Sequence, residues 1–491
     1  MKLSSLLSIL PFYQLTHDID TININSIKID HRHIEPGDIF VCIKGFTVDG
    51  HDFALQAVEN GAIAVVAERE LDLGDTPVII VSDTTRALAL LATKYYQFPS
   101  KRLPLIGVTG TNGKTTVTYL VEAIFKAAKQ KTGLIGTIQM KIGDDTYPVQ
   151  NTTPNALVVQ QSLSQMVDEQ VDVAVMEVSS HALDLGRVHG CDYDIAVYTN
   201  LSQDHLDYHK NMADYLRAKS LLFSQLGNDY NEKQQKFAII NRDDEHYAAI
   251  EQSTGQHIIT YGINNKADVM AENISLQISQ TNFLLTTPIG SIEITSQLIG
   301  AFNVYNMLAA ASVAIAMNVP LSTIKTAFES ITGVNGRFEQ VNAGQNYAVI
   351  VDYAHTPDSL ENVLTTIKEF ATKNIYVVVG CGGDRDRSKR PLMAEIATQY
   401  ADLALFTTDN PRTEDPKDIL ADMTDGLTST NYEVIVDRKE AIERAIHLAK
   451  EDDVILIAGK GHETYQEINH VRYDFDDRQV AKDAIIAKES D

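Results

Sequence analysis

A glycine loop between an apolar run and a helical pattern is the strongest constraint on how this chain folds. Residues 105–108 are all apolar or glycine and predict a buried strand, residues 109–116 read Thr-Gly-Thr-Asn-Gly-Lys-Thr-Thr, and residues 117–128 have helical periodicity. Glycines let backbone amides converge on phosphate oxygens, and the helix that follows points its positive end at them. The segment matches a short GxGK[ST] pattern, because Val108 stands where the full phosphate-loop pattern has its first glycine.

This loop predicts a site for ATP and magnesium. Lys114 would place its charge on the β- and γ-phosphates, and the hydroxyl of Thr115 can ligate Mg²⁺. The alternative, a glycine-rich turn with a purely structural role, is less favoured because Lys-Thr follows the second glycine and a strand and a helix flank the loop. The candidate ATP residues are Gly110, Thr111, Asn112, Gly113, Lys114, Thr115 and Thr116.

Length and charge limit the classes to which the chain can belong. Its 491 residues exceed one ordinary core, and about 100–200 residues per domain predict three domains. The formal net charge of −25 argues against nucleic-acid or anionic-membrane partners, since both need clustered Lys and Arg. Three widely spaced cysteines favour a reducing cytoplasm over disulfides or a zinc site. No apolar run reaches the ~18 residues of a membrane span, and residues 1–11 predict a first helix, not a signal peptide.

Strands and helices alternate along the whole chain, which predicts an α/β fold with parallel sheets. The expected strands lie at 39–43, 62–66, 78–81, 105–108, 171–178, 195–199, 376–380, 403–407, 432–436 and 454–458. Polar or proline-flanked joints at 98–104 and 332–337 divide the chain. We therefore predict three αβ domains, at 1–101, 102–334 and 335–491.

Polar residues follow several of these strands, where parallel sheets bind ligands. Glu177 ends the strand at 171–178, and the magnesium-ligand and ordinary strand-end interpretations are about equally favoured. The spacing of His205 and His209 predicts one helical face, but Leu206 stands where a zinc protease needs its glutamate, so a zinc site is rejected. Two interpretations of this segment remain, an imidazole that faces magnesium and the start of a helix.

Three cations give weaker signals. By periodicity alone Lys219 is an ordinary helix lysine. Arg385 occupies the third-glycine place of a dinucleotide fingerprint, which excludes that interpretation and favours an anion contact at the end of a strand. Arg412 offers a planar fork to a carboxylate, although its Asp-Asn-Pro-Arg segment alone indicates only a turn.

Together these segments make the chain resemble the Mur ligases, the ATP-dependent amide-forming enzymes of peptidoglycan synthesis. The shared motifs are Gly110-Thr111-Asn112-Gly113-Lys114-Thr115, Glu177-Val178-Ser179-Ser180-His181, Asn200 with Asp204-His205, Gly300-Ala301-Phe302-Asn303, Gly336-Arg337-Phe338-Glu339, and Asp352-Tyr353-Ala354-His355-Thr356-Pro357. Their order and number make the resemblance specific. It implies an N-terminal αβ domain for a UDP-linked substrate, a central phosphate-loop parallel-sheet ATPase domain and a C-terminal Rossmann-like domain.

Within the family, further segments resemble the ligases that add the third residue of the stem peptide to UDP-N-acetylmuramoyl-L-alanyl-D-glutamate. They are Asn151-Thr152-Thr153-Pro154, residues 199–209, Asp409-Asn410-Pro411-Arg412 and Gly459-Lys460-Gly461-His462-Glu463. The Asp-Asn-Pro-Arg motif implies meso-diaminopimelate, because lysine-adding relatives lack its arginine. The chemistry agrees, since diaminopimelate has a second amino-acid head. Its carboxylate can pair with Arg412 and Arg385, while Glu463 and the Gly459 carbonyl can hold its ammonium.

The resemblance also implies roles for single residues. Magnesium would be held by Thr115, Glu177, His205 and a carbamate on Lys219, which reverses the default for that lysine, and Lys114, Lys219 and His205 would be catalytic. The nucleotide would also contact Asn303, Arg337 and Asp352. The muramoyl peptide would contact Asn151, Thr152, Thr153, Ser179 and Arg187. The diaminopimelate would contact Arg385, Asp409, Asn410, Pro411, Arg412, Gly459 and Glu463.

The chain departs from the family at one place near its N-terminus. The family usually has Asp-Ser-Arg there, with the serine at the uridine nucleotide, whereas this chain has Asp30-His31-Arg32. The imidazole of His31 can still form a hydrogen bond, so His31 stays in the predicted substrate site.

The sequence thus predicts a cytoplasmic, monomeric enzyme that uses ATP and Mg²⁺ to join two small molecules. ATP would phosphorylate the γ-carboxylate of the D-glutamate, the amine of meso-diaminopimelate would attack the acyl phosphate, and the third domain would close over the second. Three alternatives stay open. They are the same ligation with L-lysine, which Arg412 disfavours; folylpolyglutamate synthase, which lacks the extra N-terminal domain; and a phosphate-loop switch protein that hydrolyses ATP to change shape.

Overall fold

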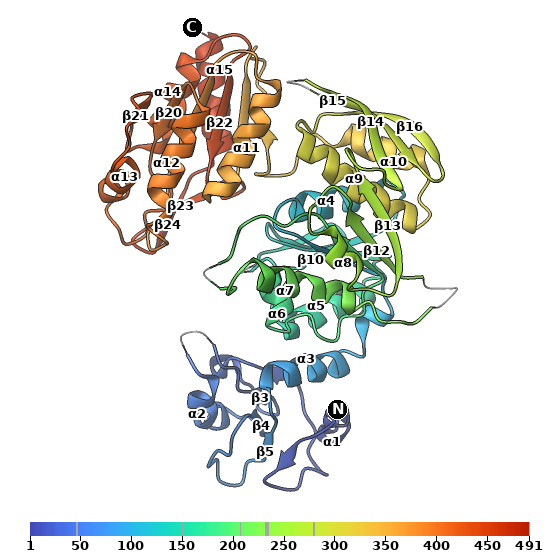
Figure 1. The fold of residues 1–491 in the computed structure, drawn as a ribbon. Coiled ribbons are helices and arrows are strands. Elements are labelled where there is room, and N and C mark those ends of the chain that lie inside the picture. Colours follow the sequence, from blue (N-terminus) through green and yellow to red (C-terminus); the bar gives the residue numbers. More distant parts are fainter. Residues whose placement is uncertain (46–47, 150, 207, 231–234, 278–279, 491) are drawn as a thin grey trace.

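Three α/β units follow one another along the chain. The computed structural model describes residues 1–45, 48–149, 151–206, 208–230, 235–277 and 280–490. Within these residues each unit has its own sheet, and the units appear in Figure 1 as the blue, the cyan-to-yellow and the orange-to-red parts. The predicted α/β class and three-domain order are confirmed, whereas the boundaries at 101/102 and 334/335 stay predictions. No helix among the described residues is long and apolar enough to cross a membrane.

The first unit is a small sheet flanked by short helices. Its elements are α1 (Leu3–Leu7), β1 (Gln14–Leu15), β2 (Ile27–Lys28), β3 (Ile39–Val41), α2 (Ala54–Glu59), β4 (Ala64–Ala67), β5 (Val78–Ile80) and α3 (Thr84–Tyr95). The strand order is β1-β5-β4-β3-β2, and all neighbours are parallel except β1 with β5. Leu3, Leu6 and Leu7 are buried in the core, so the apolar N-terminal segment forms a helix, as predicted.

The second unit is built around the strand that carries the glycine loop. Its first elements are β6 (Leu105–Thr109), α4 (Lys114–Ala127), β7 (Thr132–Ile135), β8 (Met140–Ile142), β9 (Asp145–Tyr147), α5 (Ala156–Asp168), β10 (Val173–Glu177), α6 (Ser180–Asp184) and β11 (Ile195–Tyr198). Then follow α7 (Met212–Ser224), β12 (Phe237–Asn241), α8 (Tyr247–Glu251), β13 (His257–Gly262), β14 (Val269–Leu276), β15 (Thr281–Thr287), β16 (Gly290–Ser296), α9 (Ala301–Ala316) and α10 (Leu321–Ser330).

The sheet of this unit is mixed, with a parallel centre. The strands β7, β10, β6, β11, β12, β13 and β14 lie side by side and parallel. This confirms the predicted parallel sheet, although only β6, β10 and β11 were expected as strands. Antiparallel strands extend both edges, β8 and β9 beyond β7, and β15 and β16 beyond β14. These edge strands were not predicted, because half-exposed antiparallel strands lack the continuous apolar runs that mark the buried parallel ones.

Helices cover both faces of the central sheet and bury the loop-bearing strand. On one face α4, α9 and α10 pack through apolar residues such as Val117, Met307 and Phe328, and on the other α5, α6, α7 and α8 form a second cluster. β6 is buried along its whole length. Since its neighbours β10 and β11 are parallel to it, the carboxyl ends of all three strands lie together.

The third unit is a parallel sheet between two helical layers. Its elements are β17 (Glu339–Gln340), β18 (Ala348–Asp352), α11 (Pro357–Phe370), β19 (Ile375–Val379), α12 (Lys389–Tyr400), β20 (Leu403–Phe406), α13 (Pro416–Thr424), β21 (Tyr432–Val434), α14 (Arg438–Leu448), β22 (Val454–Ala458), β23 (Tyr465–Ile468), β24 (Val471–Asp474) and α15 (Asp477–Ser490). The order is β17-β18-β22-β19-β20-β21, antiparallel only at β17. α11, α12 and α13 cover one face and α14 and α15 the other, which is the expected Rossmann-like arrangement.

One local prediction is wrong. His205 and His209 do not share a helical face, because the helix in this region, α7, begins only at Met212. His205 has a left-handed backbone with a φ of 56°, which is incompatible with an α-helix. The N-cap is Asn211, whose side chain accepts a hydrogen bond from the backbone of the first turn. Asp207, within the predicted helical stretch, lies outside the described residues.

Candidate active site

The glycine loop folds tightly against the carboxyl end of β11. Gly110 has a φ of 147°, and a Cβ on it would lie 1.8 Å from Thr199 Oγ1. Gly113 has a φ of 86°, and a Cβ on it would lie 2.4 Å from the Oδ1 atom of Asn306. Both positions therefore require glycine. α4 begins directly after them at Lys114, so the unbonded N–H groups of its first turn lie at the loop.

Two lysine ammonium groups meet at this loop. Lys114 Nζ donates to the carbonyl oxygens of Gly110 at 3.0 Å and Thr111 at 2.7 Å. Lys219 Nζ, from α7, donates to the same oxygen of Gly110 at 2.7 Å and lies 4.3 Å from the ring of Tyr215. Lys219 is only 1% exposed, and burial, with the charge of Lys114 adding, lowers the pKa of its amine far below the usual value. The predicted pair of lysines is therefore brought together.

Glu177 lies beside the loop, where three donors hold its carboxylate. The side chain is completely buried at the end of β10. Thr115 Oγ1 donates to Oε2 at 2.9 Å, while Thr137 donates from its N to Oε1 at 2.7 Å and from its Oγ1 to Oε2 at 3.0 Å. Sequence analysis missed Thr137. Its position two residues after a buried strand of the same parallel sheet is the signal that could have identified it.

The predicted muramoyl-peptide residues fall into two groups. Four of them gather beside Glu177, namely Thr152, Thr153, Ser179 and Arg187. Thr153 Oγ1 donates to the Glu177 carbonyl at 2.7 Å and accepts from Ser179 N at 3.1 Å, and Arg187 Nη1 donates to the Thr153 carbonyl at 3.1 Å. Thr152 Oγ1 lies 3.1 Å from the hydroxyl of Thr137. Asn151 is exposed on a bend outside this hydrogen-bonded cluster.

His31 lies in the N-terminal unit, within the short 3₁₀ turn His31–His33. Its ring stacks on that of Phe53, with centroids 4.5 Å apart. Asp30 caps the turn and accepts two hydrogen bonds from the Arg32 guanidinium, which holds the pKa of the Asp30 carboxyl well below its usual range. The stacking on Phe53 holds the imidazole beside this charged pair. The fold thus has room for histidine at the position where the family usually has serine.

His205 sits at the rim of the loop cluster. Its ring lies 4.8 Å from that of His181 in an edge-on arrangement, and Nε2 is 3.4 Å from Asp204 Oδ2. Among the residues that the structure describes, no three His, Cys, Asp or Glu side chains converge in a way that would hold a metal ion. A magnesium ion at Glu177 would therefore need ligands beyond a cluster of such side chains, for example hydroxyl groups, phosphate oxygens or water.

The predicted nucleotide residues lie at the junction of the second and third units. Asn303 Oδ1 accepts from Asn306 Nδ2 at 3.1 Å, and Asn306 in turn abuts Gly113 of the loop. The guanidinium of Arg337 lies 5.0 Å from the Tyr353 ring, and its buried Nε has no hydrogen-bond partner among the described residues. Asp352 accepts from two backbone N–H groups; burial raises the pKa of its carboxyl, while Arg337 opposes that rise.

The predicted diaminopimelate residues meet at the carboxyl ends of β22, β19 and β20, which are neighbours in the third sheet. Gly383 N donates to the Asn410 carbonyl at 2.9 Å, and Arg412 Nη1 donates to the Gly383 carbonyl at 2.7 Å. Gly459 approaches Asp409 so closely that a Cβ would lie 2.6 Å from Asp409 Oδ2. Three separate loops thus form one cluster, as the carboxyl-end rule predicts.

The remaining members of this cluster differ in exposure. Arg412 and exposed Arg385 both border Gly382, since a Cβ there would lie 3.0 Å from Arg412 Nη1 and 3.8 Å from Arg385 Cγ. Pro411 is buried, and Glu463 Oε2 accepts from Asn410 Nδ2 at 2.8 Å. The hairpin of β23 and β24 docks on this loop through a hydrogen bond from Arg412 N to the backbone of β23.

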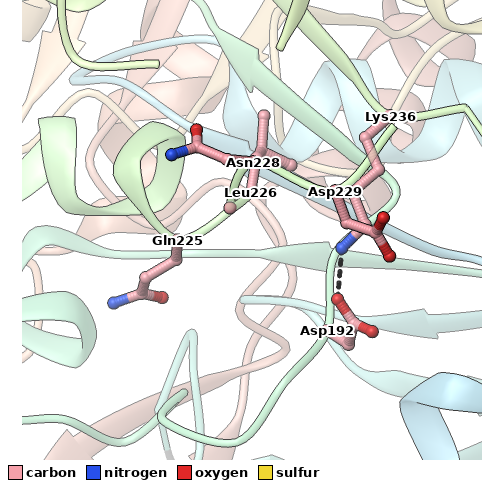
Figure 2. A pocket seen from close by; sticks show the side chains of 7 residues that line it. Asp192, Gln225, Leu226, Asn228, Asp229 and Lys236 are labelled. Carbon is pink, nitrogen blue, oxygen red and sulfur yellow. Dashed lines mark hydrogen bonds and ion pairs between the residues drawn. The ribbon is translucent and has the colours of Figure 1, made fainter. Parts of the chain in front are cut away.

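A polar cavity of about 260 Å³ lies elsewhere in the second unit (Figure 2). Asp192, Leu226, Asp229 and Lys236 are among its lining residues, and Lys236 forms an ion pair with Asp192. No predicted site residue lines it. The predicted site residues therefore lie outside this cavity.

Comparison with known proteins identifies the family of the chain. Three family models match: "Mur ligase family, catalytic domain" at residues 23–96, "Mur ligase middle domain" at 108–314 and "Mur ligase, glutamate ligase domain" at 336–461. A relative from Oceanobacillus iheyensis is 60% identical over 99% of this chain and 100% of its own length. It is named UDP-N-acetylmuramoyl-L-alanyl-D-glutamate--2,6-diaminopimelate ligase.

Solved structures show the same architecture. A structure with the same ligase name is 36% identical, covers 99% of both chains and superposes with a TM-score of 0.72. MurF from Acinetobacter baumannii, at 23% identity and a TM-score of 0.65, covers 93% of this chain and 95% of its own and shares the fold. The identity and coverage of the relatives leave no ambiguity of class: the chain belongs to the Mur ligase family.

Proposed function

We propose that this chain is an ATP-dependent ligase that joins meso-diaminopimelate to UDP-N-acetylmuramoyl-L-alanyl-D-glutamate during peptidoglycan precursor synthesis. The observation that carries the proposal is a phosphate loop with Lys114 and Glu177 in one unit and a cluster of Arg412 and Glu463 in the next. The first can activate a carboxylate with ATP. The second can recognise a zwitterionic amino-acid head. The name of the Oceanobacillus iheyensis relative supports the same reaction.

The phosphate loop would bind ATP and assist transfer of its γ-phosphoryl group. In the structure Lys114 donates to loop carbonyls, and the ammonium would turn to the phosphates when they bind. The γ-carboxylate of the substrate glutamate attacks the γ-phosphorus, the bond to the β-bridging oxygen breaks, and ADP leaves. Thr152, Thr153, Ser179 and Arg187 would hold the muramoyl peptide beside Glu177 for this attack.

A magnesium ion fits the residues around Glu177. The buried carboxylate and the Thr115 hydroxyl are hard oxygen ligands, and Mg²⁺ in such enzymes takes few protein ligands together with substrate phosphates and water. When bound, the ion would neutralise charge on the transferring phosphoryl group. By the family resemblance, His205 and a carbamate on Lys219 would supply further ligands.

Lys219 has the properties that carbamate formation requires. Only a neutral amine attacks CO₂, and burial lowers the pKa of this amine, so the neutral form is populated at a lower pH than for an exposed lysine. The new C–N bond releases a proton and converts the side chain from a cation to an anion. That anion would attract the ammonium of Lys114, which shares the Gly110 carbonyl with Lys219.

Amide formation would complete the reaction. Arg412 would pair with the distal carboxylate of diaminopimelate, and Glu463 with the distal ammonium. The free amine at the other end attacks the acyl carbon, the tetrahedral intermediate expels inorganic phosphate, and the nitrogen loses a proton. The third unit would have to move toward the loop for this step; the hydrogen bond from Ser202 Oγ to Asp358 Oδ2, 3.0 Å long, already joins the two units.

Replacement of Lys114 tests the phosphate loop. We expect Lys114→Ala to lower kcat by about 10²–10³-fold or more, because a cation on the transferring group is lost. The effect is measured as phosphate release from ATP with both other substrates present. Lys126→Ala, on the exposed side of the same helix, should keep wild-type turnover, and an active Lys114→Ala enzyme would refute the assignment.

The carbamate can be observed directly. In ¹³C-bicarbonate, wild-type enzyme should show a carbamate carbon resonance that Lys219→Met lacks, and Lys219→Met should lose most of its turnover. If the fully active enzyme has no such resonance, Lys219 acts as a free amine and our account of its role is wrong.

Replacement of Arg412 tests recognition of the distal carboxylate. Arg412→Met should raise the KM for diaminopimelate by about 10–100-fold, since a charge-assisted hydrogen bond is lost. The KM values for ATP and the UDP-linked substrate should stay unchanged. Arg472→Met, which removes an exposed arginine from the neighbouring β24, is the matched control. Equal behaviour of the two variants would contradict the proposed contact.

A further inference from the structure

A fully buried lysine lies in the middle of the proposed amino-acid site. Lys460 follows β22 and is 0% exposed. Its Nζ donates to Asn410 Oδ1 at 3.0 Å and to Glu463 Oε2 at 3.1 Å, and it lies 5.5 Å from the ring of Tyr465. Lysine is almost never fully buried unless it is paired, so the charge of Lys460 has a specific partner here.

Asn410 takes part in the same network. Its Nδ2 donates to Glu463 Oε2 at 2.8 Å, and its Oδ1 accepts from Lys460 and, at 2.9 Å, from the backbone N of Glu467. The amide oxygen and one N–H of the Asn410 side chain are therefore hydrogen-bonded within the protein itself. This geometry makes Asn410 part of the support beneath Glu463, in addition to the substrate contact that the sequence predicts for it.

The network acts on one oxygen of the Glu463 carboxylate. Asn410 and Lys460 both donate to Oε2, and the Glu463 side chain remains 16% exposed. Two fixed donors on Oε2 set the plane of the carboxylate. They also leave the acceptor capacity of Oε1 for a ligand, because an ionised carboxylate has about four lone-pair sites.

We propose that Lys460 is a positioning residue for the amino-acid substrate: together with Asn410 it orients Glu463 so that Oε1 receives the distal ammonium of diaminopimelate. Lys460 does not touch the substrate and acts through Glu463. The inference rests on the proposed function, since it assumes that Glu463 binds an ammonium. It adds a lysine and a support role for Asn410 to the proposed site.

The test is a double-mutant cycle measured on the full-length enzyme. Lys460→Met keeps the volume of the side chain and removes its charge. We expect it to raise the KM for diaminopimelate by about tenfold or more, with kcat at saturating diaminopimelate and the KM for ATP within about twofold of wild type. Glu463→Gln should raise the same KM. If Lys460 acts through Glu463, the double variant should be no worse than Glu463→Gln alone.

Two further variants keep the result decisive. Lys439→Met, at an exposed lysine of the same domain, should leave every parameter unchanged. Lys460→Gln retains a hydrogen-bond donor without a buried charge, so it should give an intermediate KM, and it replaces Lys460→Met if thermal melting shows that the latter is unfolded. An unchanged KM in a folded Lys460 variant, or additive effects in the cycle, would overturn the inference. Failure of the wild-type enzyme to use diaminopimelate would instead refute the proposed function.

Discussion

The carbonyl oxygen of Gly110 accepts hydrogen bonds from two lysine ammonium groups, and the chemistry of the central unit depends on that contact. Lys114 comes from the helix after the loop and Lys219 from α7, so the contact ties the loop to the opposite face of the sheet. Burial and the charge of Lys114 disfavour a second positive charge on Lys219, so negative charge nearby would stabilise this pair of side chains. Phosphate oxygens are anions that Lys114 would attract, so the net charge of −25 does not exclude ATP as a ligand of this loop.

The same construction principle is used twice. In the second unit the carboxyl ends of β6, β10 and β11 bring the loop, Glu177 and Thr199 together, and in the third unit those of β22, β19 and β20 bring together Gly459, Gly383 and Arg412. Each site has a rigid sheet below it and loops above it. Under the proposed function, activation of the carboxylate and delivery of the amine would take place in different units, the cyan-to-yellow and the orange-to-red parts of Figure 1, so the third unit would have to move toward the loop.

Sequence analysis predicted the features that depend on local pattern. The expected strand at 454–458 coincides with β22, and the glycine loop lies where the strand, the loop and the helix were expected. Features set by tertiary contacts were missed or wrong. Thr137 and Lys460 were missed because their roles depend on Glu177 and Asn410, which they contact in space although these lie 40 and 50 residues away in the sequence. The prediction that His205 and His209 share a helical face was wrong because the helix begins only after its N-cap, Asn211. The family resemblance supplied the roles that no pattern could give.

Under the proposed function, the Arg412 and Glu463 cluster selects diaminopimelate. The most direct measurement is a competition assay. We would incubate the wild-type enzyme with ATP, Mg²⁺, UDP-N-acetylmuramoyl-L-alanyl-D-glutamate and equal amounts of meso-diaminopimelate and L-lysine. Mass spectrometry then identifies the product by its mass. The account predicts a product that contains diaminopimelate and a lysine adduct that is at most a minor species. A predominant lysine adduct would contradict it, because a ligase for lysine has no use for a cation that binds a second carboxylate.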